Sequence, residues 1–139
     1  MLEKFFKKTE KKQENDKVLI ASLLVHAAKI DENYTEEERT IIKKAIMDLY
    51  QINVTEAEEV LKNAEKKEEE SNQIIEFTKE IKKSSMEFRH KIIEILWKIV
   101  YSDHTTDMYE SNLIRRVCGL LYVSNKDSGK IKLKVQNLK

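Results

Sequence analysis

Proline is absent from this 139-residue sequence, and glycine occurs only at Gly119 and Gly129. Sheets with tight turns usually need both residues, because glycine supplies positive φ angles and proline fixes the turn. Their scarcity favours helices joined by short polar loops. The single cysteine, Cys118, excludes an internal disulfide. Its apolar neighbours Val117 and Leu120 indicate a core thiol rather than a reactive one.

An excess of one charge is also missing, because 26 basic and 25 acidic residues leave a formal net charge of +1. Nucleic-acid-binding proteins are usually far more basic, so no nucleic-acid partner is expected. A membrane span takes about 20 apolar residues. The most apolar run, 18–28, is shorter and contains Ser22 and His26. Without a signal-peptide cleavage pattern near the N-terminus, we predict a cytoplasmic protein with no transmembrane segment.

The chain is predicted to consist of a basic N-terminal extension, residues 1–15, and one helical domain, residues 16–139. The extension combines three lysines with three large apolar residues: Lys4, Lys7, Lys8, Leu2, Phe5 and Phe6. We expect a helix that docks Phe5 or Phe6 on the domain. Peripheral contact of this basic start with a membrane surface is the alternative.

The sequence repeats itself at an offset of 72 residues, so that 24–53 aligns with 96–125 without a gap. Seven aligned pairs are identical: Leu24/Leu96, Asp31/Asp103, Glu38/Glu110, Ile42/Ile114, Leu49/Leu121, Tyr50/Tyr122 and Asn53/Asn125. Further pairs, Ile20/Ile92 and Leu61/Leu133, extend the alignment at its ends. Helical periodicity alone would not place the acidic pairs at one offset. We therefore infer a duplication, with repeats over about 16–61 and 87–133.

Each repeat is predicted to form a helix, an acidic loop and a second helix. Wide apolar stripes over 18–29 and 87–101 indicate two central, mostly buried helices. Their partner helices have one apolar face, which includes Ile42 and Ile114. Another helix is expected near the C-terminus. The predicted fold is an all-α, compact bundle of about seven helices, with its central pair related by a pseudo-twofold axis.

The segment between the repeats carries further signals for helix boundaries. Thr55 stands three residues before Glu58, which predicts a capping box at the start of a helix. The charged segment 66–72 predicts a break, and a short helix is expected after it. Ser84 and Glu87 repeat the capping-box spacing ahead of the second central helix.

Each acidic loop also ends in a signal for a helix start. Thr35 stands three residues before Glu38, and Asp107 stands three residues before Glu110. Threonine and aspartate are favoured N-caps, and a glutamate at the third helical position closes a capping box. Carboxylates in the first turn also face the positive end of the helix dipole. Helix capping is therefore the preferred interpretation of these loops.

A divalent-cation site is the second interpretation of the same loops. Asp31 lies seven residues before Glu38, and Asp103 lies seven before Glu110. With loop carbonyls, these carboxylates could supply the oxygen ligands that Ca²⁺ or Mg²⁺ prefers. A calcium-binding EF-hand is excluded, because neither loop has the required glycine. His104, beside Asp103, is a further candidate ligand.

The repeated pattern resembles the TerB-like family, which includes tellurite-resistance TerB proteins and the N-terminal domain of the co-chaperone DjlA. The pattern is an apolar helix, an aspartate, a glutamate seven residues on, and an apolar helix ending in Leu-Tyr before Asn. Matching stretches are 27–31 with Glu38, and 100–103 with 109–110. The likeness covers about 18–127.

This resemblance implies an all-α fold with internal symmetry, in a stand-alone domain tied to stress or metal-oxyanion resistance. It implies no established catalysis. The family usually has glycine after the aspartate, whereas Glu32 and His104 stand here. Glycine allows a left-handed turn that other residues resist, which weakens any metal role for Asp31 and Asp103.

An interaction or adaptor module with a protein partner is the function we expect, without catalytic residues or a cofactor. The sequence has neither a glycine-rich phosphate loop nor a Cys-x-x-Cys motif. Trp97 and Tyr101, four residues apart on the second central helix, indicate core packing or an exposed aromatic patch for the partner. The alternative function is divalent-metal binding through four carboxylates: Asp31, Glu38, Asp103 and Glu110.

Overall fold

The computed structural model describes residues 2–30, 34–71, 74–102 and 108–137, and every regular element in these ranges is helical. The elements are α1 (Leu2–Lys29), α2 (Glu36–Tyr50), α3 (Val54–Glu70), α4 (Ile75–Thr78), a short 3₁₀ helix (Ile81–Lys83), α5 (Met86–Ser102), α6 (Met108–Leu120) and α7 (Asn125–Asn137). The all-α prediction is confirmed, and the two central helices end within one residue of their expected positions.

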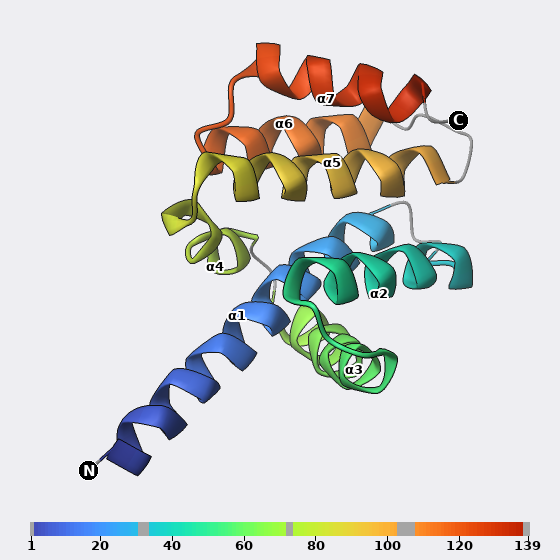
Figure 1. Cartoon of the computed structure of the whole chain (residues 1–139). Helices are drawn as coiled ribbons and strands as arrows, with labels where there is room; N and C mark the ends of the chain where they lie inside the picture. The colour runs from blue at the N-terminus through green and yellow to red at the C-terminus, as the bar shows by residue number, and fades with distance from the viewer. Residues whose placement is uncertain (1, 31–33, 72–73, 103–107, 138–139) are drawn as a thin grey trace.

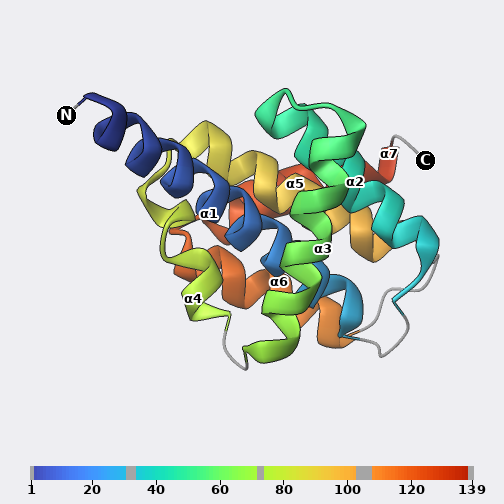
Figure 2. The same ribbon diagram turned by 90° about the horizontal axis from the view of Figure 1, so that it is seen from below.

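The helices form two groups, α1–α2–α3 and α5–α6–α7, with α4 between them in the chain (Figure 1). Within each group the first helix contacts both the second and the third. Contacts of α5 with α1 and α2 join the groups. Seen from below, α3 crosses over the second half of α1 (Figure 2). None of the described helices is both long and apolar enough to cross a membrane.

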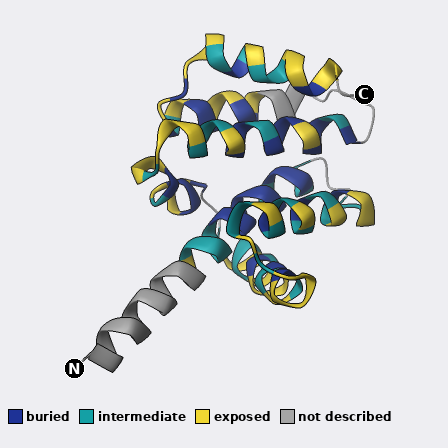
Figure 3. Ribbon diagram, in the orientation of Figure 1, coloured by how far each residue is buried: buried dark blue, intermediate teal, exposed yellow. Residues whose placement is uncertain are grey.

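The buried face of α1 matches the buried face of α5 at the predicted offset. From residue 15 to the end of α1, every buried apolar residue has a buried apolar residue 72 positions later: Ile20/Ile92, Ala21/Ile93, Leu23/Ile95, Leu24/Leu96, Val25/Trp97, Ala27/Ile99 and Ala28/Val100. These faces form the middle of the core (Figure 3). The wide stripes of the sequence are thus central helices, as predicted. The pseudo-twofold axis stays a prediction.

The offset changes from 72 to 71 residues where the second helix of each group ends. Gln51 and Tyr122 close α2 and α6 in the left-handed region, with φ of 52° and 56°. After them, Ile52 N donates to Met47 O at 3.3 Å, and Val123 N donates to Cys118 O at 2.9 Å. A hydrogen bond from a backbone N–H to the carbonyl five positions earlier provides a partner for one of the last carbonyls of the helix.

This one-residue slip makes the pairing of Leu61 with Leu133 wrong. Leu61 is fully buried on α3, whereas Leu133 on α7 is 59% exposed. One residue rotates a helix by about 100°, which is enough to turn a core position toward solvent. At the shifted offset, the buried Ala64 corresponds to the buried Val135.

The capping box predicted at Thr55 and Glu58 is also wrong. Helix α3 begins at Val54, and the Asn53 side chain accepts a hydrogen bond from Glu56 N at 2.9 Å. Asparagine caps at least as well as threonine, and the closure of α2 leaves Asn53 extended at the cap position.

The second central helix starts one residue later than the predicted box at Ser84 and Glu87. Ser85 Oγ accepts a hydrogen bond from Phe88 N at 3.1 Å, and α5 begins at Met86. The 3₁₀ helix before it uses Ser84 as its C-cap, so Ser84 N donates to Ile81 O at 2.9 Å. The short helix expected in this connector is present as α4.

The N-terminal extension is the first part of α1, whose N-terminal end points away from the other helices (Figure 1). The helix is continuous through the expected boundary at residue 15. The side chains of 2–14 lie outside the described part of the chain. Docking of Phe5 or Phe6 on the domain therefore stays a prediction.

Candidate functional site

The structure describes the side chain of only one of the four candidate metal ligands. Asp31 and Asp103 lie outside the described residues. Glu110 is in the first turn of α6, but its side chain also lies outside them. Glu38 is in the first turn of α2 and is 1% exposed. The proposed metal site therefore stays a prediction.

Glu38 forms the predicted capping box with Thr35. Thr35 Oγ1 accepts a hydrogen bond from Glu38 N at 3.1 Å, and Glu38 Oε1 accepts one from Thr35 N at 3.0 Å. The threonine hydroxyl lies 3.0 Å from the same carboxylate oxygen. Two backbone N–H groups at the start of α2 thus gain partners. Helix α6 starts at Met108, directly after the predicted cap Asp107, which is itself outside the described residues.

Replacing Thr35 with alanine is expected to lower the free energy of unfolding by about 1 kcal/mol, because the cap is lost. Thr55→Ala should have little effect, since Asn53 rather than Thr55 caps α3. Urea denaturation followed by circular dichroism measures both changes. Lys66→Ala, at an exposed position of α3, is the control. An equal loss at Thr35 and Thr55 would contradict the observed helix starts.

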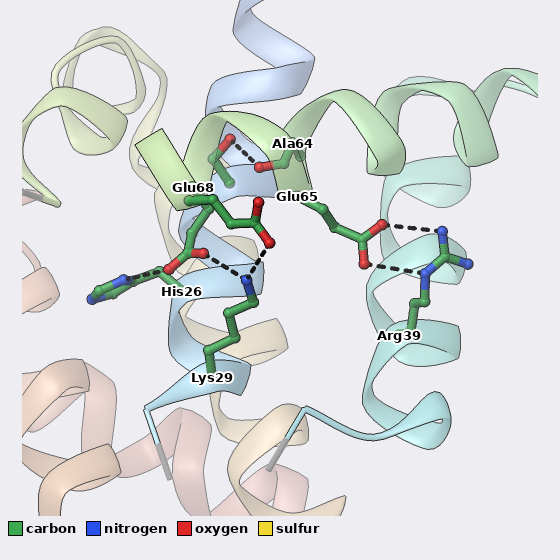
Figure 4. A network of polar contacts seen from close by, with 8 residues as sticks. His26, Lys29, Arg39, Ala64, Glu65 and Glu68 are labelled. Atoms are coloured by element: carbon green, nitrogen blue, oxygen red, sulfur yellow. Dashed lines mark hydrogen bonds and ion pairs between the residues drawn. The ribbon is translucent and has the colours of Figure 1, made fainter. Parts of the chain in front are cut away.

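A network of ion pairs ties α3 to α2. Arg39 donates from Nη1 and Nη2 to the two carboxylate oxygens of Glu58, at 3.0 and 2.7 Å. Its Nε and Nη2 also donate to Glu65, both at 3.2 Å (Figure 4). Lys43 Nζ lies 2.8 Å from Glu58 Oε2. One arginine of α2 therefore binds two carboxylates that lie two turns apart on α3.

The same helix is tied to α1 further along. Glu68 accepts from Lys29 Nζ at 3.0 Å, and its other oxygen lies 3.2 Å from His26 Nδ1 (Figure 4). The hydroxyl of Ser22, which is fully buried, lies 3.3 Å from the carbonyl oxygen of Ala64. The predicted break over 66–72 is wrong for its first five residues, because α3 continues to Glu70. These contacts explain why. Its glutamates are partners of neighbouring helices, so the charged sequence continues as helix.

Electrostatics fix the charge states in this network. Hydrogen bonds from Arg39 and Lys43 lower the pKa of Glu58 from 4.5 to about 2. Burial, with the nearby Glu65 carboxylate, raises the pKa of the Tyr34 hydroxyl. Because the Glu58 pKa is lowered on folding, its contribution to stability is present above pH 4.5 and is lost as the pH falls through 2. The network is thus a structural connection in which the Glu58 carboxylate is held ionised.

Within the described ranges, no group of three or more histidine, cysteine, aspartate and glutamate side chains could hold a metal ion. Cys118 is 1% exposed, and burial raises the pKa of its thiol. A low-pKa, accessible thiolate is what nucleophilic cysteines require. The prediction that Cys118 is a core residue is confirmed.

Trp97 is likewise a core residue, which agrees with core packing rather than with an exposed aromatic patch. It is 6% exposed, and its Nε1 donates to Ser128 Oγ of α7 at 3.2 Å. Its ring stacks on that of Tyr101, with 6.0 Å between centroids. The pair joins α5 to α7 and leaves no exposed tryptophan for a partner.

An open groove lies between α2 and α5. It has a volume of about 580 Å³. Its floor is apolar and comes from three helices: Ile41, Ala45, Leu49, Phe88, Ile95 and Val135. The α2 residues of the floor recur every four positions and are only partly buried. Such a row on a helix is an exposed continuation of the core stripe.

Charged residues form the two walls of this groove. Helix α2 contributes Glu37, Lys44 and Asp48, and α5 contributes Lys91, Glu94 and Lys98. The two helices run in opposite directions (Figure 1). Glu94 is already paired with Lys134 at 3.3 Å and lies 4.0 Å from Lys98. The α5 wall is therefore net basic and the α2 wall net acidic.

Sequence reasoning missed this groove because its walls are about 50 residues apart in the chain. The signal available in the sequence was the row Ile41, Ala45 and Leu49, spaced four residues apart on the apolar face of this helix. Only the spacing of α2 from α5 shows that this row is left partly uncovered.

The family model described as "Tellurite resistance protein TerB" matches residues 17–133, which includes both walls of the groove. No curated protein and no solved structure matches the chain.

Proposed function

Because the match covers residues 17–133, the chain belongs to the TerB tellurite-resistance family, and on this premise we propose an interaction module of a stress- or tellurite-type resistance system. The groove between α2 and α5 is its binding surface. Its apolar floor beside two charged walls is the observation that carries the proposal.

The shape and chemistry of the groove suit an amphipathic helix of a partner protein. Helix-in-groove recognition inserts apolar residues at positions i, i+3, i+4 and i+7 into an apolar channel. Ile41, Ala45 and Leu49 supply one side of such a channel, and Phe88 and Ile95 the other. The charged walls then fix the direction and register of the bound helix, as rim charges generally do.

Catalysis is not part of this proposal. The described carboxylates of the α1–α2–α3 network are paired with cations, and the lone thiol is buried with a raised pKa. A base or nucleophile needs a group whose pKa is matched to its task and which can reach a substrate.

Blocking the groove tests the proposed function. We expect the native gene to protect its host against tellurite. Ala45→Arg places a long side chain on the floor and should abolish that protection. Lys66→Arg, on the exposed face of α3, should protect like the native protein. Circular dichroism melts check that both variants fold. Full protection by a folded Ala45→Arg protein would contradict the proposal.

Divalent-metal binding through Asp31, Glu38, Asp103 and Glu110 is the alternative function. A bound ion at a hundred times its dissociation constant would stabilise the fold by about 2.7 kcal/mol. That gain would raise the melting temperature by several degrees, at roughly 2–5 °C per kcal/mol. Because Glu38 Oε1 already accepts the capping hydrogen bond, we favour capping.

Millimolar Ca²⁺, Mg²⁺ or Mn²⁺ is therefore expected to shift the melting temperature by less than about 2 °C. Asp31→Asn and Asp103→Asn should each cost little stability, since asparagine caps and turns as well as aspartate. Differential scanning calorimetry with and without metal measures both effects. A larger metal-dependent rise that both variants abolish would establish metal binding instead.

A further inference from the structure

We propose that the groove between α2 and α5 takes a short helical segment of a partner protein with the chemistry of residues 74–83 of this chain, here called the α4 segment. That partner segment carries large apolar side chains at positions i, i+3 and i+7 and carboxylates along one flank. This inference rests on the proposed function of the groove as a helix-binding surface, and it names the sequence pattern that the surface takes.

The apolar row of α2 that lines the groove has a buried copy in the other half of the chain. The three pairs, 72 residues apart, are Ile41/Leu113, Ala45/Val117 and Leu49/Leu121. The row of α2 is only partly buried, whereas all three residues of the later row are buried. The later row is therefore covered where the row of α2 is open.

The neighbours of α2 and α6 differ in one place. Helix α2 packs mainly on α1, α3 and α5, and the helices that correspond to these at the offset are α5, α7 and α1. The main neighbours of α6 are α5, α7 and α4, and α4 also contacts α1 (Figure 2). Helix α4 therefore lies at the place between α6 and α1 that corresponds to the open groove between α2 and α5.

The backbone explains why the first half of the chain leaves this place open. The residues 72 positions before the α4 segment are 2–11. They belong to the continuous helix α1, whose N-terminal end points away from the other helices (Figure 1). Within the described ranges, the groove therefore has no counterpart of α4 on its floor.

The α4 segment shows which side chains such a place takes. Ile74, Phe77 and Ile81 are 3%, 1% and 1% exposed and belong to the core cluster. They stand at positions i, i+3 and i+7, which is the spacing that helix-in-groove recognition uses. Seven residues of helix cover about 10.5 Å, close to the distance of about 12 Å from Ile41 to Leu49 along α2. A partner helix with these three positions therefore fits the length of the floor.

The charges of the α4 segment also suit a groove with one acidic and one basic wall. In a continuous helix, at 100° per residue, Glu80 and, further round, Glu76 lie on one flank of the apolar face, and Lys82 lies on the other. Lys79 and Lys83 lie on the side opposite the apolar face. Because a helix can lie in the groove in either direction, one direction places the two carboxylates on the α5 wall and the basic flank on the α2 wall.

The α5 wall has an excess of positive charge for those carboxylates. Its one carboxylate, Glu94, lies 3.3 Å from Lys134 Nζ of α7 and 4.0 Å from Lys98 Nζ. Lys91, which is exposed, adds a further positive charge to the wall. A partner carboxylate at this wall therefore meets three lysines and a single carboxylate, which favours an acidic flank.

Peptide binding to the full-length chain tests the proposal. The probe has the sequence of residues 74–84, with capped ends, a fluorescent label and a hydrocarbon link between positions 79 and 83. The link replaces the two outward lysines and holds the helix, so the apolar face and both flanks stay unchanged. Fluorescence polarisation should show saturable binding, with a dissociation constant of about 100 µM or tighter.

Changes on either side of the contact should weaken this binding. Ala45→Arg in the protein should weaken it about tenfold or more, and Ile41→Asp is a second floor variant that serves if the first does not fold. Phe77→Ala in the peptide should cause a loss of the same size, since it removes the largest apolar side chain. Lys66→Arg, on the exposed face of α3, is the control and should bind the peptide as the native chain does.

Charge reversal tests the acidic flank. A peptide with Glu76→Lys and Glu80→Lys should bind the native protein about threefold or more weakly at low salt, and Lys91→Glu in the protein should recover part of that loss. Equal binding of the native and charge-reversed peptides would overturn the assignment of the acidic flank to the α5 wall.

The whole proposal is overturned if the linked peptide shows no saturable binding up to about 500 µM. It is also overturned if both floor variants bind the peptide as the native chain does, because the peptide would then be displacing α4 from its own place. Dimers of the native chain that the peptide dissociates would assign the groove to a second copy instead. If the peptide fails to bind while Ala45→Arg still removes tellurite protection, the groove's proposed function stands with another occupant.

Discussion

Replacing Leu24 or Leu96 with alanine is expected to lower the free energy of unfolding by about 3–4 kcal/mol in each case. Both side chains are fully buried, and they stand at matching positions of the two central helices. Leucine-to-alanine changes in a core cost the transfer free energy of the removed atoms and that of the cavity left behind. Urea denaturation of the two variants and the native protein gives the values.

Leu133→Ala is the matched control for these changes, because this leucine is 59% exposed on α7. Leu133→Ala should lower the free energy of unfolding by no more than about 0.5 kcal/mol, as for most surface positions. A loss at Leu133 as large as that at Leu96 would show that the slip to a 71-residue offset is wrong. A negligible loss at Leu24 or Leu96 would contradict the central placement of α1 and α5.

Trp97→Ala should destabilise the fold by about 3–5 kcal/mol, since it empties a large aromatic site between α5 and α7. Trp97→Phe keeps an aromatic ring and should cost about 1 kcal/mol, mainly the hydrogen bond to Ser128. Circular dichroism must follow unfolding, because Trp97 is the only tryptophan and its fluorescence is lost in both variants.

The size of the Trp97→Ala loss separates a core residue from a partner-binding one. A cost below about 1 kcal/mol would match an exposed aromatic side chain, as most surface changes are nearly neutral. The Trp97 ring stacks on Tyr101, and Lys132 Nζ lies 5.1 Å from its centroid. These contacts predict the larger loss of stability for Trp97→Ala.

Sequence alone predicted the all-α fold, the two central helices, the capping box at Thr35 and the family. Those features depend on information local to the chain. The 3.6-residue period decides which residues share a face, and a cap needs residues only three positions apart. Leu24 and Leu96 could thus be assigned to the core before any packing was known.

Only the tertiary structure decided the continuation of α3 to Glu70 and the groove. Whether a charged turn stays helical depends on its partners, and Glu68 pairs with Lys29 on another helix. Likewise, Ile41 and Ala45 continue the apolar stripe of α2, but the distance to α5 determines whether they are covered. An apolar row has the same sequence whether it faces a core or a groove, because burial is set by the neighbouring helices rather than by the row itself.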